Sequence, residues 1–394
     1  MTALAVRIAL VAGEASGDLL ASQLIQALRA KLPNAVFFGV GGPKMLGMGF
    51  DAWYPLETLA VRGYAEVLGR FREIAAIRRQ LSRRLLADPP DVFIGVDAPD
   101  FNLSLEKTLK KRGISTIHYV SPSIWAWRGG RIHKIGAAAS RVLALFPFEP
   151  ALYERHGIPV SYVGHPLADM LPLADGRDDA RALLGLSPQE PVFALLPGSR
   201  QGELKYMADA FIETARRIHQ AIPDAVFLAP MATRETRLLF EAALHRCEVP
   251  ELPIRLLFGH AHQAMMVADV VLVASGTATL EAALLKRPMV MVYKMSPVSY
   301  WLMQRIGGYL PYYSLPNILC GRFVVPEFIQ DDATPENIAQ AVLNLYADKA
   351  VCERLRAVFR EMHLKLRQNA AEKAAAAVLG QLSSTVSASV AVNA

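Results

Sequence analysis

Residues 6–18 read VRIALVAGEASGD, an apolar strand-like run that ends in a loop of small residues and opens a helix. Residues 192–203 repeat this pattern as VFALLPGSRQGE, near the middle of the chain. A third loop, SGTATLE at 275–281, also joins a predicted strand to a predicted helix. Such loops offer backbone N–H groups and the positive end of a helix to an anion. Two such units this far apart predict two doubly wound domains that face a cleft.

The alternation of strands and helices predicts an α/β fold with parallel sheets. Strands are expected at 6–12, 35–40, 92–96, 115–120, 142–146 and 160–163, and again at 192–196, 225–229, 254–258, 270–274 and 289–293. We predict a Rossmann-like domain over 1–165, a polar linker over 166–190 and a second Rossmann-like domain over 191–334. Helices at 335–382 should pack on the first domain or on a partner subunit, and residues 383–394 should be a frayed tail.

Composition excludes several classes of protein. Hydrophobic residues make up 53% of the 394, yet the chain lacks an uncharged apolar run long enough to span a membrane. The start of the chain does not resemble a signal peptide, so we expect a cytoplasmic protein with three reduced cysteines. The net charge of +6 suits an anionic substrate or membrane surface, and no nucleic-acid-binding signature accompanies it. His260 and His262 have no carboxylate near them in the sequence, so we expect no metal site.

The loop after 192–196 has side chains that suit a phosphate group. Gly198 allows a ligand to approach the backbone, and Ser199 offers an N–H group and a hydroxyl. Arg200 adds a guanidinium that can bind a phosphate through two hydrogen bonds. Glu203 should face away from the phosphate or cap the helix. An ordinary turn with an exposed arginine would have the same sequence.

The loop at 275–281 suits the rest of a nucleoside diphosphate. Ser275 and Gly276 are small enough for a ligand to lie on the helix start, and Thr277 and Thr279 offer hydroxyls. Glu281 lies one helical turn after Thr277, where its carboxylate can accept hydrogen bonds from the hydroxyls of a ribose. The alternative is a capped helix with a solvated glutamate. The usual nucleotide motifs are missing, since the chain has no P-loop and GVGGP at 39–43 lacks the third glycine of a dinucleotide site.

The segment GVDAPDFN at 95–102 follows another predicted strand. Asp97 is nearest the strand end and therefore most rigidly placed, which suits a general base. Asp100 and Asn102 are expected to cap the following helix. In the first loop, Glu14, Ser16 and Asp18 are candidates for acceptor binding or for shaping the turn.

Aromatic and basic residues follow the strand at 115–120. The segment YVSPSIWAWR at 119–128 ends in two tryptophans and Arg128. Trp127 could stack on a sugar ring, and Arg128 could pair with an acidic group of an acceptor. The alternative is that one of the two tryptophans packs in the core. His118 is expected to be structural.

A helix predicted over 66–87 is richer in apolar residues than one buried face requires. Ile74, Ile77, Leu81 and Leu85 provide a core-facing stripe, while six arginines lie between the apolar positions. Val67, Leu68 and Phe71 would then be exposed beside arginines, as in helices that bind membrane surfaces.

These segments together resemble the lipid-A-disaccharide synthases, a family of glycosyltransferases. The resemblance is carried by VAGEASGD at 11–18, DAPDFN at 97–102, HYVSPSIWAWR at 118–128, LLPGSR at 195–200, SGTATLE at 275–281 and SLPN at 314–317. The motifs occur in order over residues 6 to about 330.

The resemblance implies a GT-B fold of two Rossmann-like domains with a helical C-terminal region. It implies UDP-2,3-diacylglucosamine as donor, 2,3-diacylglucosamine 1-phosphate (lipid X) as acceptor, and inverting transfer without a cofactor or metal. Peripheral association with the cytoplasmic face of the inner membrane follows, and the family is compatible with a homodimer. The resemblance implies that the general base is Asp97. The implied donor site consists of Ser199, Arg200, Ser275, Gly276, Thr277, Glu281 and Asn317, and the candidate acceptor site consists of Glu14, Ser16, Asp18, Trp127 and Arg128. The lipid-facing patch consists of Val67, Leu68, Phe71 and Ile74.

Two other classes of protein share part of this pattern. Another GT-B enzyme that acts on a UDP-sugar, such as a UDP-N-acetylglucosamine 2-epimerase, would need Glu281 and residues 275–277 but not the apolar patch. A non-catalytic protein that binds nucleotide sugars could keep both phosphate loops and would not need Asp97.

Overall fold

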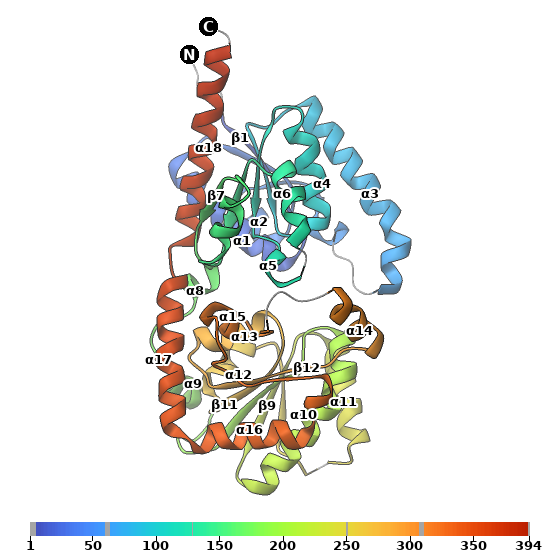
Figure 1. The fold of residues 1–394 in the computed structure, drawn as a ribbon, viewed down its shortest axis with the longest axis vertical. Helices are drawn as coiled ribbons and strands as arrows, with labels where there is room; N and C mark the ends of the chain where they lie inside the picture. The colour runs from blue at the N-terminus through green and yellow to red at the C-terminus, as the bar shows by residue number, and fades with distance from the viewer. Residues whose placement is uncertain (1–4, 60–63, 128, 250, 307–310, 393–394) are drawn as a thin grey trace. The chain divides into compact units, whose positions relative to one another are not determined.

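The computed structural model describes residues 5–59, 64–127, 129–249, 251–306 and 311–392. The chain forms two compact units, one of Met1–Asp169 with Leu366–Ala394 and one of Met170–Lys365. Each unit contains a parallel sheet with helices packed against it (Figure 1), which confirms the predicted α/β class.

The first unit has seven strands in the order β3-β2-β1-β4-β5-β6-β7. The order reverses between β1 and β4, the position at which doubly wound sheets bind their ligands. Its strands are β1 (Arg7–Ala12), β2 (Val36–Gly41), β3 (Asp51–Pro55), β4 (Val92–Val96), β5 (Ser115–Tyr119), β6 (Arg141–Ala144) and β7 (Val160–Tyr162). Its helices are α1 (Ala15–Lys31), α2 (Pro43–Gly47), α3 (Tyr64–Ala87), α4 (Pro99–Lys110), α5 (Ile124–Trp127), α6 (Ile132–Ala138), α7 (Glu149–Glu154), α8 (Pro166–Met170) and α18 (Ala370–Val392), with 3₁₀ turns η1 (Leu56–Thr58) and η2 (Gly129–Arg131).

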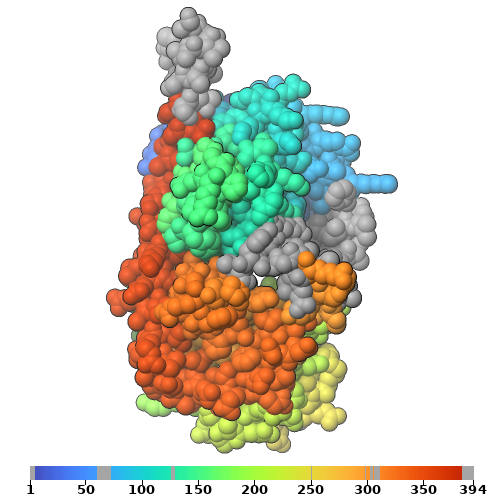
Figure 2. All heavy atoms as spheres, viewed as in Figure 1, coloured from blue at the N-terminus to red at the C-terminus, as the bar shows by residue number. Residues whose placement is uncertain are grey.

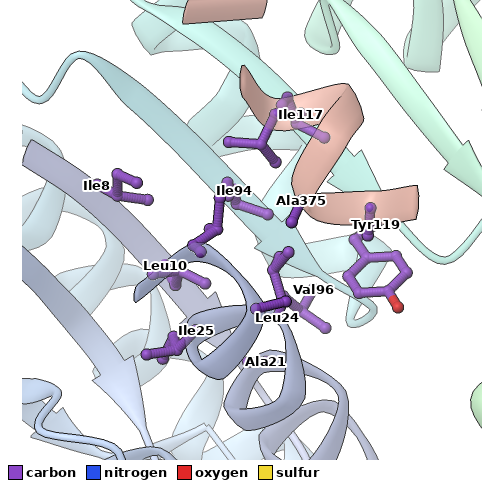
Figure 3. Close-up of a cluster of buried hydrophobic side chains, with 14 of the residues drawn as sticks. Ile8, Leu10, Ala21, Leu24, Ile25, Ile94, Val96, Ile117, Tyr119 and Ala375 are labelled. Carbon is purple, nitrogen blue, oxygen red and sulfur yellow. The ribbon is translucent and has the colours of Figure 1, made fainter. Parts of the chain in front are cut away.

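Strand β1 shows why this sequence forms a sheet that is covered on both sides. Successive side chains of a strand point to opposite faces. Ile8 and Leu10 accordingly belong to one buried cluster, with residues of α1 and α18, while Ala9 and Val11 belong to another, with α3 and α4. Figure 3 shows the first cluster, in which Ala375 of α18 lies near strands β4 and β5. Each large apolar side chain buried in this way contributes about 1.5–3 kcal/mol.

The second unit has six strands in the order β10-β9-β8-β11-β12-β13. These strands are β8 (Val192–Leu196), β9 (Val226–Met231), β10 (Ile254–Phe258), β11 (Val270–Ala274), β12 (Met289–Tyr293) and β13 (Glu327–Ile329). The helices are α9 (Arg177–Leu183), α10 (Gln201–Ala221), α11 (Arg234–Arg246), α12 (Ala261–Val267), α13 (Thr277–Leu284), α14 (Pro297–Ile306), α15 (Leu315–Cys320), α16 (Pro335–Ala347) and α17 (Lys349–Leu366), with 3₁₀ turn η3 (Gln330–Asp332).

The segment at 166–190, expected to be a polar linker, contains α8 and α9. Arg181 of α9 is fully buried and donates hydrogen bonds to the carbonyl of Val267 and to the carboxylate of Asp269. Arg177 also pairs with Asp269. These bonds attach the polar part of the segment to the second unit, which explains why it is ordered.

The C-terminal helices are divided between the units. Helix α16 packs against α10 of the second unit, whereas α18 packs against α1 of the first. The red atoms of α18 lie at the surface of the first unit (Figure 2). Helix α18 continues to Val392, through most of the segment 383–394 in which we expected a frayed tail. Each residue added to an existing helix gains a backbone hydrogen bond without a new nucleation cost.

In the part of the chain that the structure describes, we find no helix both long enough and apolar enough to cross a membrane.

Candidate active site

Three loops of the first unit lie together at the carboxyl ends of β1, β4 and β5. Strand β4 pairs in parallel with both neighbours, so the three loops emerge at one edge of the sheet. Asp97 follows β4 directly, and its N–H donates to the carbonyl of Tyr119 at 2.8 Å. Its side chain is half-buried. The structure therefore places the predicted base where open α/β sheets bind their ligands.

The backbone at this edge is strained. Asp97 has φ 52° and Ala98 has φ 43°, and Val120 at the end of β5 has φ 82°. Positive φ is uncommon outside glycine, and for a β-branched residue such as Val120 it is an outlier. Conformations of this kind cost about 1–3 kcal/mol each and are concentrated at functional sites.

The prediction that Asp100 and Asn102 cap helix α4 was wrong. Ala98 occupies the N-cap position, where its methyl group offers no capping hydrogen bond. Asp100 is exposed and pairs with Arg131 at 2.8 Å. Asn102 is fully buried, and its amide donates to the carbonyl of Asp97. The left-handed turn moves the helix start to Ala98, so neither polar side chain can reach the capping position.

The first loop contains two exposed candidates and one buried one. Glu14 and Ser16 are exposed at the start of α1. Asp18 is buried, and its carboxylate accepts hydrogen bonds from the backbone N–H groups of Gly42, Lys44 and Met45 at 2.9–3.1 Å. These groups form the start of α2, which attracts negative charge. Asp18 therefore fixes α2, in line with the turn-shaping alternative, and acceptor binding by this residue stays a prediction.

The tryptophan segment is only partly described. Trp125 packs edge-on against Phe146 and Phe148, and its indole N–H donates to Glu149 at 3.2 Å. Trp125 is thus structural, as one of the two tryptophans was expected to be. Trp127 ends α5, and neither its side chain nor residue Arg128 is among the described atoms.

The second unit brings the two phosphate-loop candidates together. Strand β8 pairs in parallel with β11, so the loops at 197–203 and 275–281 lie at the same edge of the sheet. Ser199 and Arg200 are exposed, and 78% of the Arg200 side-chain surface is accessible. Glu203 caps α10, because its carboxylate accepts the N–H groups of Ser199 and Arg200 at 3.1 and 3.3 Å. The Ser199 N–H predicted to meet a phosphate is therefore already bonded, which leaves its hydroxyl and the guanidinium of Arg200.

The start of α13 is built from small residues. Gly276 occupies the N-cap position with φ 127°, and its side chain offers no capping group. Ser275 is half-buried and Thr277 is exposed, so both are accessible to a ligand. Thr279 is fully buried; its hydroxyl donates to the carbonyl of Gly276 and accepts from the N–H of Leu315. Thr279 is therefore structural, and the prediction that it offers a hydroxyl to the ligand was wrong.

Glu281 has a partner that the sequence did not reveal. Its carboxylate lies 2.8 Å from Nε2 of His262, at the start of α12. The hydrogen bond to Glu281 raises the pKa of His262, and partial burial opposes the shift. The expectation that His262 has no carboxylate near it was wrong, because α12 and α13 pack together although nineteen positions separate the two residues. Among the described residues we find no group of three or more potential metal ligands.

Asn317 is enclosed by protein. It is fully buried on α15, and its Oδ1 accepts the N–H groups of Val324 and Val325 at 2.7 and 2.9 Å. Its Nδ2 donates to the carbonyl of Val325 and to the carboxylate of Glu327. All of its hydrogen-bonding capacity is therefore used within the protein. Asn317 therefore holds the segment around α15, and its contact with the donor stays a prediction.

The predicted lipid-facing patch is mostly outside the described side chains. Val67, Leu68 and Phe71 lie on α3, but only the backbone is described at these positions. Ile74 is half-buried and packs against the core between the sheet and helices α3 and α4. Its position in the core-facing stripe explains why it is not part of a fully exposed patch.

Solved structures define the class of protein. The chain superposes on a putative UDP-N-acetylglucosamine 2-epimerase from Listeria monocytogenes with a TM-score of 0.64 at 11% identity, covering 96% of this chain and 95% of that one. It superposes on CalG4, the calicheamicin glycosyltransferase, with a TM-score of 0.60 at 16% identity, covering 97% and 99%. At such low identity the similarity establishes only the fold, which is the two-domain GT-B fold of UDP-sugar enzymes and glycosyltransferases.

The sequence relatives define the family. A family model described as lipid-A-disaccharide synthetase matches residues 8–379. The chain is 62% identical to the lipid-A-disaccharide synthase of Dechloromonas aromatica, over 95% of this chain and 98% of that one. It is 56% identical to the protein of the same name from Chromobacterium violaceum, over 95% and 97%. The chain belongs to the lipid-A-disaccharide synthetase family.

Proposed function

We propose that the protein transfers a diacylglucosaminyl group from UDP-2,3-diacylglucosamine to the 6-hydroxyl of lipid X. The products are the β-1,6-linked disaccharide 1-phosphate and UDP. The observation that carries this proposal is the identity of 62% over 95% of the chain to a protein named lipid-A-disaccharide synthase. The strained loop of the first unit and the anion-accepting loops of the second are compatible with it.

Asp97 is the proposed general base. Its carboxylate takes the proton of the 6-hydroxyl as that oxygen forms a bond to C1 of the donor sugar. The bond from C1 to the diphosphate breaks, and its electron pair leaves with UDP. An α-linked donor gives a β-linked product, so a single displacement with one base is sufficient. The backbone bonds at Asp97 support this role because they hold the residue at a strand end.

The second unit is proposed to bind the donor. The diphosphate lies at the start of α13, against Ser275, Gly276 and Thr277, where the helix end is positive. Ser199 and Arg200 bind the same group from the neighbouring loop, and Glu281 accepts the ribose hydroxyls. Charge that develops on the leaving UDP is then stabilised by fixed dipoles and the guanidinium of Arg200, without a metal ion.

The first unit is proposed to bind lipid X. Glu14 and Ser16 are exposed beside the turn of Asp97, and Trp127 and Arg128 follow β5 in the sequence. Asp18 contributes indirectly by holding α2. Asn317 contributes in the same indirect way to the donor site, by holding the segment around α15.

We further propose that the protein associates with the cytoplasmic face of the inner membrane. Both substrates carry acyl chains, so their reactive groups lie close to a lipid surface. Val67, Leu68 and Phe71 would insert among the lipids, and the arginines of α3 would meet anionic headgroups. Ile74 would lie at the inner margin of this patch. A homodimer stays an expectation from the family resemblance.

The proposal is tested by incubating the purified protein with UDP-2,3-diacylglucosamine and lipid X in detergent, with and without EDTA. Disaccharide 1-phosphate and UDP, followed by mass spectrometry, should form equally in both. A parallel incubation with UDP-N-acetylglucosamine tests the epimerase alternative. Epimerised sugar nucleotide together with an absence of disaccharide would refute the proposal.

A further inference from the structure

Three polar side chains are buried beneath the turn that carries Asp97. Asn102, Glu106 and His118 are all fully buried. Asn102 and Glu106 lie one turn apart on α4, and His118 lies on β5 opposite Gly95 of β4. Such a cluster requires an explanation, because apolar residues of similar volume often give equal or greater stability.

Asn102 joins the turn to the ends of two strands. Its Nδ2 donates to the carbonyl of Asp97 at 2.8 Å. The same nitrogen lies 3.3 Å from the carbonyl oxygen of Val11 in β1 and 3.4 Å from that of Val96 in β4. One amide group thus contacts both strands from which the acceptor and base loops emerge.

The Glu106–His118 pair fixes the face of α4 from which Asn102 projects. Oε1 of Glu106 lies 2.7 Å from Nδ1 of His118. Gly95 makes room for this arrangement, since a Cβ there would overlap Oε1 of Glu106 and lie 2.9 Å from Cβ of Asn102. Burial raises the pKa of Glu106, while His118 and the more distant Lys110 oppose the shift.

Each of the three side chains in the cluster has one polar atom without a hydrogen-bond partner among the described residues. Oδ1 of Asn102, Oε2 of Glu106 and Nε2 of His118 are buried without a partner among the residues that the structure describes. A buried polar group that lacks a partner destabilises the fold, because it has lost its hydrogen bonds to water. The turn above the cluster is also strained, at Asp97 and at Ala98. Unsatisfied buried groups directly below a strained turn indicate a role other than stability.

We propose that Asn102 is a positioning residue for Asp97, and that Glu106 and His118 hold Asn102 in place. The hydrogen bond to the Asp97 carbonyl fixes the left-handed turn, so that the carboxylate keeps one direction at the edge of the sheet. Asn102 itself does not touch the substrate. The proposal rests on the role of Asp97 as the base, put forward above.

The test compares turnover in Asn102→Ala and Asn102→Leu with the wild type. Leucine branches at the same carbon as asparagine and has no polar atoms, so this variant removes the hydrogen bonds without leaving the cavity that alanine leaves. We expect kcat to fall roughly 10–100-fold, because small misplacements of catalytic groups have effects of this size. The affinity for UDP, measured by calorimetry, should stay unchanged, since the donor residues lie in the other unit.

A second substitution separates positioning from general stability. Glycine adopts positive φ without strain, so Ala98→Gly should restore part of the kcat lost in Asn102→Ala. Gly380→Ala, at an exposed position of α18 with open space around it, should stabilise the same unit and restore none of the lost kcat.

Wild-type kcat in Asn102→Leu would overturn the proposal, and so would equal restoration by Ala98→Gly and Gly380→Ala. If the wild type forms no disaccharide, the proposed function fails, and this proposal fails with it.

Discussion

Gly95 offers the sharpest test of how the first unit is packed. Replacing it with alanine adds one methyl group that overlaps Oε1 of Glu106 and lies 2.9 Å from Cβ of Asn102. A glutamate at a surface could swing away, but Glu106 is fully buried and bonded to His118. The methyl group must therefore break that pair or displace α4.

Breaking a buried charged or polar pair typically costs about 3–5 kcal/mol. In a domain of this size each kcal/mol lowers Tm by about 2–4 °C, so Gly95→Ala should lower the Tm of the first unit by roughly 6–20 °C. The assay is scanning calorimetry of the full chain. Gly47→Ala in α2 is the matched control, because a Cβ at Gly47 meets nothing within 4 Å. Equal Tm values for Gly95→Ala and Gly47→Ala would refute the account of the buried cluster.

Three further predictions concern other parts of the molecule. The His262–Glu281 pair should stabilise the second unit fully below pH 6.5, the ordinary pKa of histidine, and progressively less as pH rises through the raised pKa of His262. Thermal unfolding of wild type and His262→Gln across pH tests this. A difference in Tm between the two proteins that does not change with pH would contradict it. Burial raises the pKa of Glu149 to about 7, so the stability of the first unit should fall as pH rises from 4.5, the ordinary pKa of glutamate, toward 7. Because Trp125 donates a hydrogen bond to Glu149, tryptophan fluorescence should change near pH 7 in the wild type but not in Glu149→Gln. Phe71→Asp should reduce co-sedimentation of the protein with phosphatidylglycerol vesicles severalfold. The control Leu46→Asp, at an apolar residue of α2 that is 51% exposed, should not reduce it. An equal loss in both variants would show that the apolar patch of α3 is not the membrane-binding surface.

The sequence predicted the strands and loops with most accuracy where long apolar runs meet small residues. Strands β1, β8 and β11 are runs of this kind, buried throughout in β8 and β11 and from Ile8 onward in β1, and the loops that follow them lie at the sheet edges as expected. Strands β3 and β13 were missed. DAWYP contains an aspartate and a proline, and EFI has only three residues, so neither shows a recognisable strand pattern.

The side chains around the site were harder to predict than the loops that carry them. Asp18, Thr279 and Asn317 all lie in or near loops that we predict to bind ligands, and all three turn inward to bond backbone groups. A polar residue near a strand end has the same sequence signal whether it faces a ligand or fixes a loop. Only the fold decides which direction is available.

Pairs of interacting side chains that lie far apart in the sequence were equally hard to predict from it. His262 meets Glu281 because two helices pack together, and Glu106 meets His118 because Gly95 leaves space between α4 and the sheet. The glycine in GVDAPDFN was the one available signal of the second pair, since a strand interior rarely benefits from glycine.

The measurement that tests the central claim most directly is turnover by Asp97→Asn beside Asp100→Asn. Both changes remove one carboxylate from the same short segment, but the carboxylate of Asp100 is exposed and pairs with Arg131. Disaccharide formation from UDP-2,3-diacylglucosamine and lipid X would be followed by mass spectrometry, with UDP affinity measured on the same samples. We expect Asp97→Asn to lose about 10²–10⁴-fold in kcat at unchanged UDP affinity, and Asp100→Asn to keep wild-type turnover. Wild-type turnover in Asp97→Asn would contradict the assignment of Asp97 as the base.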